Sequence, residues 1–179
     1  MNTIHFTPFP TLMTERLILR QMTEDDLDEF YILKSDRRIV EPYGAQPKTY
    51  EQARAFLEKL NAYIRKDESI VWGIALKEEN RLIGSICYWN MNDEGTKAEV
   101  GYELMVEQQG KGYMQEALEA VIQYGFQDMK LNRIEAVPNP KNFPSVKLLK
   151  RSHFIQGETF TEPDFNGKPV DRVLYFLEN

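Results

Sequence analysis

The chain has 179 residues, of which 42% are hydrophobic, 28% charged and 12% aromatic, which is the composition of one ordinary globular domain. Disordered, collagen-like and low-complexity proteins are excluded, and a domain of this length can fold without a metal or a disulfide. Twenty-two basic residues against 28 acidic ones give a net charge of −6. This charge argues against a nucleic-acid backbone or an anionic membrane as the main partner and weakly favours a cationic substrate.

Cysteine and histidine are scarce. Cys87 is the only cysteine, so an internal disulfide is impossible and we expect a cytoplasmic protein. His5 and His153 are the only histidines, so the sequence predicts no zinc site and no other metal site. Met1–Pro10 has no basic region followed by an apolar stretch, and the apolar runs elsewhere are short. We therefore expect neither a signal peptide nor a membrane-spanning helix.

The first third of the chain predicts one strand and two helices. Residues 15–21 alternate between polar and apolar side chains, which is typical of a strand. Thr23 begins a helix with acidic residues in its first turn, and prolines and a glycine in residues 42–47 form a loop. Thr49 and Gln52 then form a capping-box pattern ahead of a second helix.

From Ser69 onward the periodicity changes to that of strands. Three antiparallel strands are expected at Ile70–Leu76, Leu82–Met91 and Ala98–Met105. They are followed by a helix at Gly112–Met129, a strand at Arg133–Val137, a helix at Phe143–Ser152, and two strands that flank a turn at residues 164–167. The order strand, helix, strand predicts a right-handed parallel crossover. No repeat or linker is visible, so we expect a single mixed α/β domain over residues 1–179.

One segment carries a chemical pattern. A strand that ends near Met105 is followed by Gly110, Lys111 and Gly112, and a helix begins directly afterwards. Glycines in this place let backbone amides at a helix N-terminus contact a pyrophosphate, and a lysine adds positive charge. The competing interpretation is that the glycines only form a strand-to-helix turn. The segment does not match the Walker phosphate-binding motif, because Tyr113 follows Gly112 where the motif requires lysine. It does not match the dinucleotide-binding motif either, because Gln115 stands where that motif requires its third glycine.

The segment Gln109-Gly110-Lys111-Gly112-Tyr113-Met114 resembles the coenzyme A loop of the GNAT N-acetyltransferases, Gln/Arg-x-x-Gly-x-Gly/Ala, and departs from it at Met114. Three further segments resemble the ribosomal-protein-alanine acetyltransferase (RimJ/RimL-like) branch: residues 14–20, residues 99–104 and residues 139–149. His153-Phe154 stands where that branch usually has Gly-Phe. The resemblance spans nearly the whole chain.

The resemblance implies a mostly antiparallel sheet of about seven strands with about four helices, in which the fourth and fifth strands splay apart at a bulge. It also implies acetyl-CoA as cosubstrate. The residues that it assigns to acetyl-CoA are Leu104, Met105 and Val106 through their backbone, Gln109 to Met114 in the loop, and Asn139, Asn142 and Lys147 beyond it. An amide near Leu104 would stabilise the oxyanion, and Asn142 would orient pantetheine or substrate. Lys147, Lys150 and Arg151 lie near enough to meet adenosine phosphates, or form a solvated helix face.

For catalysis the resemblance favours Glu99 as the base and Ser145 as the group beside the leaving sulfur. Glu99 and Glu103 share strand parity, so both project from one face. A surface salt bridge is the competing role for these carboxylates, a backbone hydrogen bond is the competing role for Ser145, and Tyr102 and Tyr113 are other possible acids.

The expected reaction is direct transfer of an acetyl group to a primary amine, in particular a protein N-terminus of the ribosomal-protein type. The alternatives are acetylation of a small amine such as a polyamine or an antibiotic, and a non-catalytic coenzyme A-binding module. Acidic residues in the loops are expected to frame the acceptor: Glu41, Asp93, Glu94, Glu162 and Asp164. Aromatic residues expected on exposed strands at residues 154–160 and 170–176 favour a homodimer.

Overall fold

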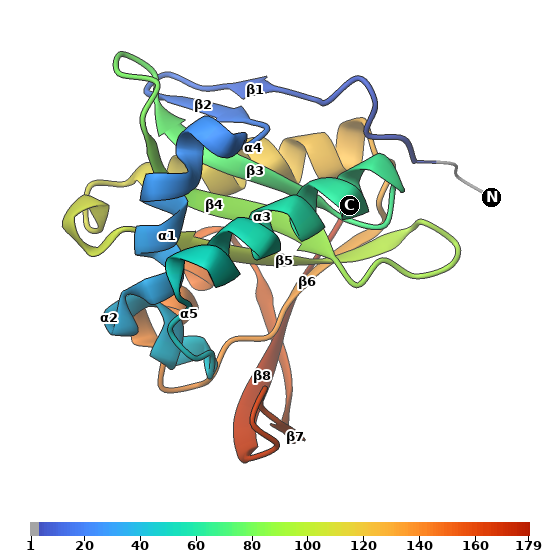
Figure 1. The fold of residues 1–179 in the computed structure, drawn as a ribbon. Coiled ribbons are helices and arrows are strands. Elements are labelled where there is room, and N and C mark those ends of the chain that lie inside the picture. The colour runs from blue at the N-terminus through green and yellow to red at the C-terminus, as the bar shows by residue number, and fades with distance from the viewer. Residues whose placement is uncertain (1–3) are drawn as a thin grey trace.

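The computed structural model describes residues 4–179 and contains one eight-stranded sheet with helices on both faces (Figure 1). The strands are β1 (Leu12–Met13), β2 (Leu17–Arg20), β3 (Ile70–Leu76), β4 (Leu82–Trp89), β5 (Lys97–Leu104), β6 (Arg133–Ala136), β7 (Ile155–Pro163) and β8 (Pro169–Glu178). The α-helices are α1 (Leu27–Ser35), α2 (Arg37–Val40), α3 (Tyr50–Arg65), α4 (Tyr113–Gln127) and α5 (Phe143–Arg151). Short 3-10 helices are η1 (Glu24–Asp26), η2 (Glu41–Tyr43) and η3 (Val106–Gln108).

The strands lie in the order β1-β2-β3-β4-β5-β6-β8-β7. β5 and β6 run parallel, joined by the crossover through α4, and the other neighbouring pairs are antiparallel. The expected mixed α/β fold is therefore confirmed, with eight strands and five α-helices in place of about seven and about four. The expectation for Met1–Pro10 falls partly on residues 1–3, which lie outside the described residues.

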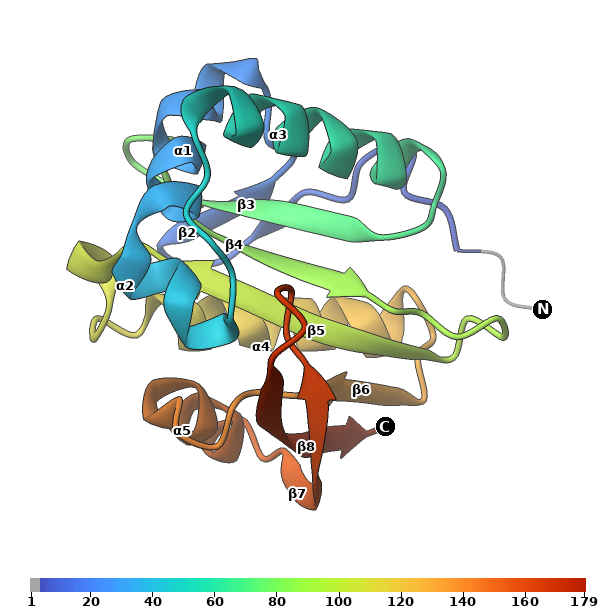
Figure 2. The same ribbon diagram turned by 60° about the horizontal axis from the view of Figure 1, so that its bottom comes forward.

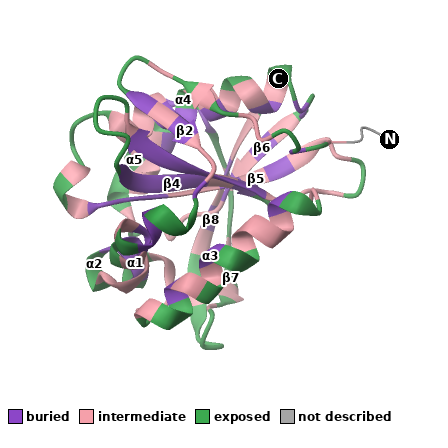
Figure 3. Ribbon diagram, turned by 45° about the horizontal axis from the view of Figure 1, so that its top comes forward, coloured by how far each residue is buried: buried purple, intermediate pink, exposed green. Residues whose placement is uncertain are grey.

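The helices form two layers. α1, α2 and α3 cover one face of the sheet, and α4 with α5 beside it covers the other (Figure 2). The second layer is fixed by buried contacts: the Tyr88 hydroxyl of β4 donates to the Val121 carbonyl of α4 at 2.9 Å, and the ring of Trp72 packs edge-on against Tyr124. Because both faces are covered, β3 and β4 are buried along most of their length (Figure 3).

Local sequence signals account for most element ends. Thr49 and Gln52 form the expected reciprocal capping box at α3, and Gly44 ends η2 in the left-handed region at φ +79°. The helix expected from Thr23 begins as the 3-10 turn η1 before it continues as α1. The predicted loop at residues 42–47 overlaps η2, since Pro42 suits the first turn of a helix.

The aromatic side chains of the last strands are less exposed than expected. Phe154 and Tyr175 are buried, and Phe160 and Phe176 are partly covered. Phe154 and Tyr175 pack into this chain's own core, whereas the Phe176 ring lies 3.9 Å from the Arg133 guanidinium, and the homodimer stays a prediction. Among residues 4–179, none of the helices combines the length and the apolar character that a membrane span requires.

β5 and β6 separate after a short pairing. Lys97, Ala98 and Glu99 pair with residues 133–135 of β6, but β5 continues to Leu104 along β4 alone. The expected splay is present, whereas the expected bulge is wrong: β5 stays in register with β4 from Glu99 to Leu104. The strands part because β6 ends at Ala136 and the chain leaves the sheet towards α5.

Candidate active site

The splay opens into a cavity of about 730 Å³, here called the reaction cavity. Residues from both faces of the sheet line it, and they include Lys34, Tyr43, Phe56, Leu60, Tyr63, Val71, Ser85, Cys87, Trp89, Glu99, Tyr102, Glu103, Asn139, Asn142, Ser145, Glu162 and Asp164. Two distant loops meet beside it: a Cβ placed on Gly44 would lie 3.2 Å from the Cβ of Asp164, at the tip of the β7–β8 hairpin. In Figure 2 this hairpin crosses in front of β5.

Alternation along β5 divides its side chains between the two layers. Glu99 and Glu103 lie opposite Trp89 and Ser85 of β4, on the face covered by α1 and α3. Tyr102 points to the other face, where it meets α5. The predicted shared parity of the two carboxylates is confirmed, and the cavity connects the two faces where β6 no longer closes the sheet.

Glu99 has the environment of a base. The pKa of its carboxyl is raised to about 7, mainly by burial and also by the nearby carboxylates of Glu162 and Glu135. The Asn90 side-chain amide donates to Glu99 Oε2 at 3.3 Å. This hydrogen bond and the positive charge of Arg172 both lower the pKa of Glu99. The carboxyl therefore exchanges its proton close to neutral pH.

Glu103 is fully engaged within the protein. Its carboxylate is buried and accepts hydrogen bonds from Lys34 Nζ, from the Tyr43 hydroxyl at 2.8 Å and from the Ser85 hydroxyl at 3.0 Å. Lys34 also lies 5.3 Å from the ring centroids of Phe30 and Phe56. Of the two carboxylates on this face of β5, Glu99 alone is left to meet a substrate.

Tyr102 and Ser145 form a pair on the opposite face. The Tyr102 hydroxyl and Ser145 Oγ are 2.7 Å apart, and burial raises the pKa of Tyr102 to about 12. Asn142, expected to contact pantetheine or substrate, caps α5 through its Oδ1, which accepts from the Ser145 amide at 3.3 Å. Asn139 accepts from the Lys141 amide, and both asparagines line the reaction cavity. Tyr113 does not line it.

The end of β5 leaves one amide facing the splay. The Met105 amide donates to the Ile83 carbonyl at 2.8 Å, and the Leu104 carbonyl accepts from the Gln109 side chain at 3.0 Å. In an antiparallel pair successive amides point to opposite sides, so the Leu104 amide points away from β4. Among Leu104, Met105 and Val106, Leu104 is therefore the best placed to donate to an extended ligand.

The predicted loop has the geometry of an anion cradle. Gly110 and Gly112 have φ of +76° and +82°, a region that favours glycine, and a Cβ on Gly110 would meet open space. Gly112 is the N-cap of α4, and no side chain caps the first amides of that helix. Lys111 is exposed at the rim, and Met114 is partly buried against the core. Lys147 is exposed on α5.

Arg16, from the residue 14–20 motif, holds this loop from behind. Its Nη1 donates to the Lys111 carbonyl at 2.9 Å, its Nε donates to Glu116 at 2.7 Å, and its guanidinium lies 4.5 Å from the centroid of the Tyr113 ring. Glu116 also accepts from the Thr14 hydroxyl and the Arg16 amide. The guanidinium thus fixes the loop and neutralises a carboxylate in the first turn of α4.

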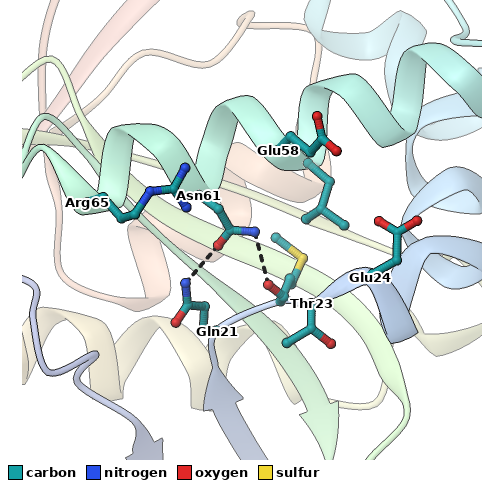
Figure 4. A pocket seen from close by; sticks show the side chains of 8 residues that line it. Gln21, Thr23, Glu24, Glu58, Asn61 and Arg65 are labelled. Carbon is teal, nitrogen blue, oxygen red and sulfur yellow. Dashed lines mark hydrogen bonds between the residues drawn. The ribbon is translucent and has the colours of Figure 1, made fainter.

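A second cavity of about 500 Å³ lies between the β2–η1 segment and α3 (Figure 4). The side-chain amides that line it form hydrogen bonds within the protein. Gln21 donates to Asn61 Oδ1 at 2.9 Å, and Asn61 donates to the Met22 carbonyl at 3.1 Å. None of the predicted site residues lines it. Within residues 4–179 no group of three or more histidine, cysteine or acidic side chains could hold a metal ion.

Contacts between residues far apart in the chain leave no signal in the sequence. Lys34 and Glu103 are 69 residues apart, and Arg16 and Glu116 are 100 apart. Of the five acidic residues expected around the acceptor, Glu162 and Asp164 line the reaction cavity, whereas Glu41, Asp93 and Glu94 do not. Glu41 is an exposed partner of Arg37 instead. The alternation of side chains along β5 predicts which face of the sheet Glu99 and Glu103 occupy. It does not predict which residues form hydrogen bonds with them.

Known proteins resemble the chain in sequence and in structure. Residues 16–155 match the family described as the acetyltransferase (GNAT) domain. The uncharacterized N-acetyltransferase p20 of Bacillus licheniformis is 39% identical over 170 residues, which are 93% of this chain and 95% of p20. The crystal structure of a GNAT-family acetyltransferase from Bacillus anthracis has a TM-score of 0.83 at 26% identity, covering 94% of this chain and 98% of that one. The chain belongs to the GNAT N-acetyltransferases.

Two further relatives are named for their substrates. Ribosomal protein uS5-alanine N-acetyltransferase of Escherichia coli is 28% identical over 155 residues, 82% of this chain and 79% of the relative. Spermidine N(1)-acetyltransferase of Vibrio cholerae is 27% identical over 172 residues, 93% of this chain and 96% of the relative.

As a GNAT enzyme, the chain transfers an acetyl group from acetyl-CoA to an amine. The residues present fit this cosubstrate. The positive-φ glycines leave amides free at the start of α4 for a pyrophosphate, and the splayed end of β5 offers the Leu104 amide to the thioester end of a ligand that extends along the strand.

Proposed function

We propose that this N-acetyltransferase acetylates the α-amine of a protein N-terminus by direct attack within a ternary complex. The observation that carries the proposal is the placement of Glu99 and the Tyr102–Ser145 pair on opposite faces of one strand, with the cavity joining them. A base and a hydroxyl donor are thereby available on the two sides of a single reaction centre.

On the α1–α3 face, Glu99 takes one proton from the substrate ammonium. Its pKa of about 7 lies just below that of an α-amine, so a useful fraction is ionised near neutrality and can still accept the proton. Acetyl-CoA supplies the thioester carbonyl that the neutral nitrogen attacks. The Leu104 amide is the group placed to stabilise the oxygen charge that develops on that carbonyl.

On the α4–α5 face, the Tyr102–Ser145 pair meets the departing sulfur. One hydroxyl donates to the other, which leaves one further O–H donor in the pair to protonate or hydrogen-bond a thiolate. The coenzyme A loop from Gln109 to Met114 holds the phosphates, with Lys111 at its rim and Lys147 on the adjacent α5. Asn139 and Asn142 line the same cavity as Tyr102 and Ser145.

The relative that acts on ribosomal protein uS5 supports a protein N-terminus as the acceptor, in which case the enzyme acts in the cytoplasm. The spermidine-acetylating relative supports a polyamine as the second candidate. The two acceptors differ in charge, since a polyamine carries several ammonium groups and an N-terminus carries one at the reacting position.

The test is a comparison of cells with and without the gene, in which acetylated protein N-termini and acetylated polyamines are measured by mass spectrometry. We expect a defined set of N-terminal peptides to lose acetylation while acetylspermidine stays unchanged. Loss of acetylspermidine with unchanged N-termini would reject the proposed acceptor in favour of a polyamine.

A further inference from the structure

An apolar groove begins directly beside Glu99. Trp89 is the register partner of Glu99, Cys87 pairs with Gly101 one step along, and Val71 pairs with Cys87 on the next strand. These three side chains lie on the α1–α3 face, and from Glu99 on β5 they reach across β4 to β3, two strand spacings or about 10 Å. They form the floor of this arm of the reaction cavity.

Helix α3 supplies the roof of the same arm. Phe56, Leu60 and Tyr63 recur at helical spacing, so they share one face of α3, and all three line the reaction cavity. Gly101 adds no side chain between floor and roof, and a Cβ placed on it would lie 3.2 Å from Cys87 Sγ. The arm is therefore an open apolar slot, here called the α3 groove and defined by Phe56, Leu60, Tyr63, Val71, Cys87 and Trp89.

Of the carboxylates that line the reaction cavity, Glu99 is the one beside the groove that the protein's own groups leave open. Glu103 is bound by Lys34, and Glu162 is paired with Arg172 at 2.9 Å. The Asp164 carboxylate accepts the backbone amides of residues 166 and 168. Glu99 is the one cavity-lining carboxylate on this face, within residues 4–179, whose only hydrogen bond comes from a neutral side chain.

An apolar groove beside one open carboxylate does not suit a polycation. A further ammonium of a polyamine or an aminoglycoside that extends into the α3 groove would enter an apolar wall without a carboxylate to replace its water. A small first residue such as alanine would reach Glu99 but leave the α3 groove unfilled. A monocation with a large apolar group beside the amine would occupy both.

We infer that the acceptor N-terminus begins with a residue that has a large apolar side chain, and that this side chain lies in the α3 groove while its amine meets Glu99. The inference rests on the proposed function and narrows its substrate class. Filling an apolar pocket that a smaller side chain leaves empty raises kcat/KM by about ten- to hundredfold.

The experiment uses the purified enzyme, acetyl-CoA and decapeptides that differ only in their first residue: Leu, Phe, Ala or Ser. Release of coenzyme A and the mass of the product give kcat/KM for each, with spermidine, tobramycin and phenethylamine as further acceptors. We expect the Leu or Phe peptide to exceed the Ala peptide at least tenfold, and spermidine and tobramycin to be poorer than all peptides.

Two variants test the groove itself. Leu60→Trp, which fills it, should lower the Leu-to-Ala ratio of kcat/KM at least fivefold. Leu60→Ala, which widens it, should shift preference from Leu towards Phe. Ala55→Trp adds the same ring at an exposed position of α3 outside the cavity and should leave the ratio unchanged. Thermal unfolding confirms that each variant is folded.

Each outcome decides the inference. Equal or better use of the Ala peptide, an unchanged ratio in folded Leu60→Trp, or faster use of spermidine or phenethylamine would overturn it. Selective acetylation of the Ala peptide would overturn the groove assignment alone and leave the proposed function standing. Binding of coenzyme A in calorimetry without acetylation of any peptide would remove the proposed function and the inference with it.

Discussion

Glu99 should set the pH dependence of turnover. The carboxylate must be ionised to accept a proton, so the rate of the parent enzyme should rise with a midpoint near pH 7. In Glu99→Gln the rate near neutrality should fall by roughly a hundredfold and then climb towards the parent rate as the amine loses its own proton. Steady-state rates from pH 6 to 9 with a confirmed acceptor provide the measurement. Equal rates at pH 7 would leave Glu99 a structural carboxylate.

Two controls separate the base from its surroundings. Glu135→Gln removes a like charge from beside Glu99 and should move the midpoint of the rate to lower pH without removing the rise of the rate with pH.

The pH dependence of unfolding gives an independent check on Glu99. The folded pKa of about 7 exceeds the ordinary value of 4.5, so the stability contributed by Glu99 is present below pH 4.5 and is lost as pH rises to about 7. Glu99→Gln should therefore be more stable than the parent above pH 7 and not below pH 4.5.

The Tyr102–Ser145 pair should act on turnover and not on affinity. Ser145→Ala and Tyr102→Phe each remove one hydroxyl of a pair 2.7 Å apart, and the charge on the leaving sulfur develops only in the transition state. We expect kcat to fall at least tenfold in each variant while coenzyme A affinity by calorimetry stays within twofold. Tyr175→Phe removes another buried hydroxyl, which donates to Gln156, and serves as the control for lost stability. Unchanged kcat in both pair variants would exclude the pair as the acid.

Arg16 should control the glycine loop before α4, to which we assign the phosphates of acetyl-CoA. Its guanidinium contacts the Lys111 carbonyl, Glu116 and the Tyr113 ring at once, a geometry that the compact ammonium of lysine cannot reproduce. Arg16→Ala leaves the Glu116 charge uncompensated near the phosphates, so KM for acetyl-CoA should rise about tenfold while kcat changes less than twofold. Arg16→Lys should not restore KM. Arg54→Ala removes an arginine of similar side-chain exposure, 42% against 41%, from an ion pair with Glu24 and should change neither constant.

The elements with local signals were predictable. The run Ile70–Leu76 was predicted with the bounds of β3, and the capping residues gave the start of α3. His153 shows how a departure from the expected family pattern meets backbone geometry: it has φ +64°, the left-handed position after α5 at which the resemblance leads us to expect glycine. The missed elements are β1 and α2, with two and four residues, and η2 and η3, with three each, which are too short for a periodic pattern to appear.

The candidate site was predictable where it depends on backbone and not where it depends on partners. Glycine spacing placed the loop, and strand parity placed Glu99 and Glu103 on one face. That Glu99 is left open while Glu103 is held by hydrogen bonds could not be predicted. This difference depends on Lys34 and Tyr43, which reach Glu103 from other elements of the fold. Hydrogen bonds between residues 60 to 69 positions apart depend on tertiary packing, so the sequence pattern around each residue does not predict them.

The network around Glu103 connects the layers of the whole molecule. Lys34 lies on α1, Tyr43 on η2, Ser85 on β4 and Glu103 on β5, so one carboxylate binds the helical layer to the sheet. Its side chain is 7% exposed and that of Lys34 is 14% exposed. A buried pair of this kind need not add net stability, but removal of one partner leaves a buried charge without compensation.

Lys34→Met should consequently destabilise the fold by about 3–5 kcal/mol, because Glu103 keeps two neutral donors but loses its cation. Glu103→Gln should have a smaller effect, and Lys34→Met with Glu103→Gln should recover most of the loss, since no charge then remains buried. Urea unfolding of the four proteins closes a double-mutant cycle that measures the coupling. Arg37→Met breaks an exposed pair with Glu41 and should cause no measurable loss. A double variant as unstable as the sum of the two single variants would mean that the pair is not coupled and that apolar packing alone holds α1 on the sheet.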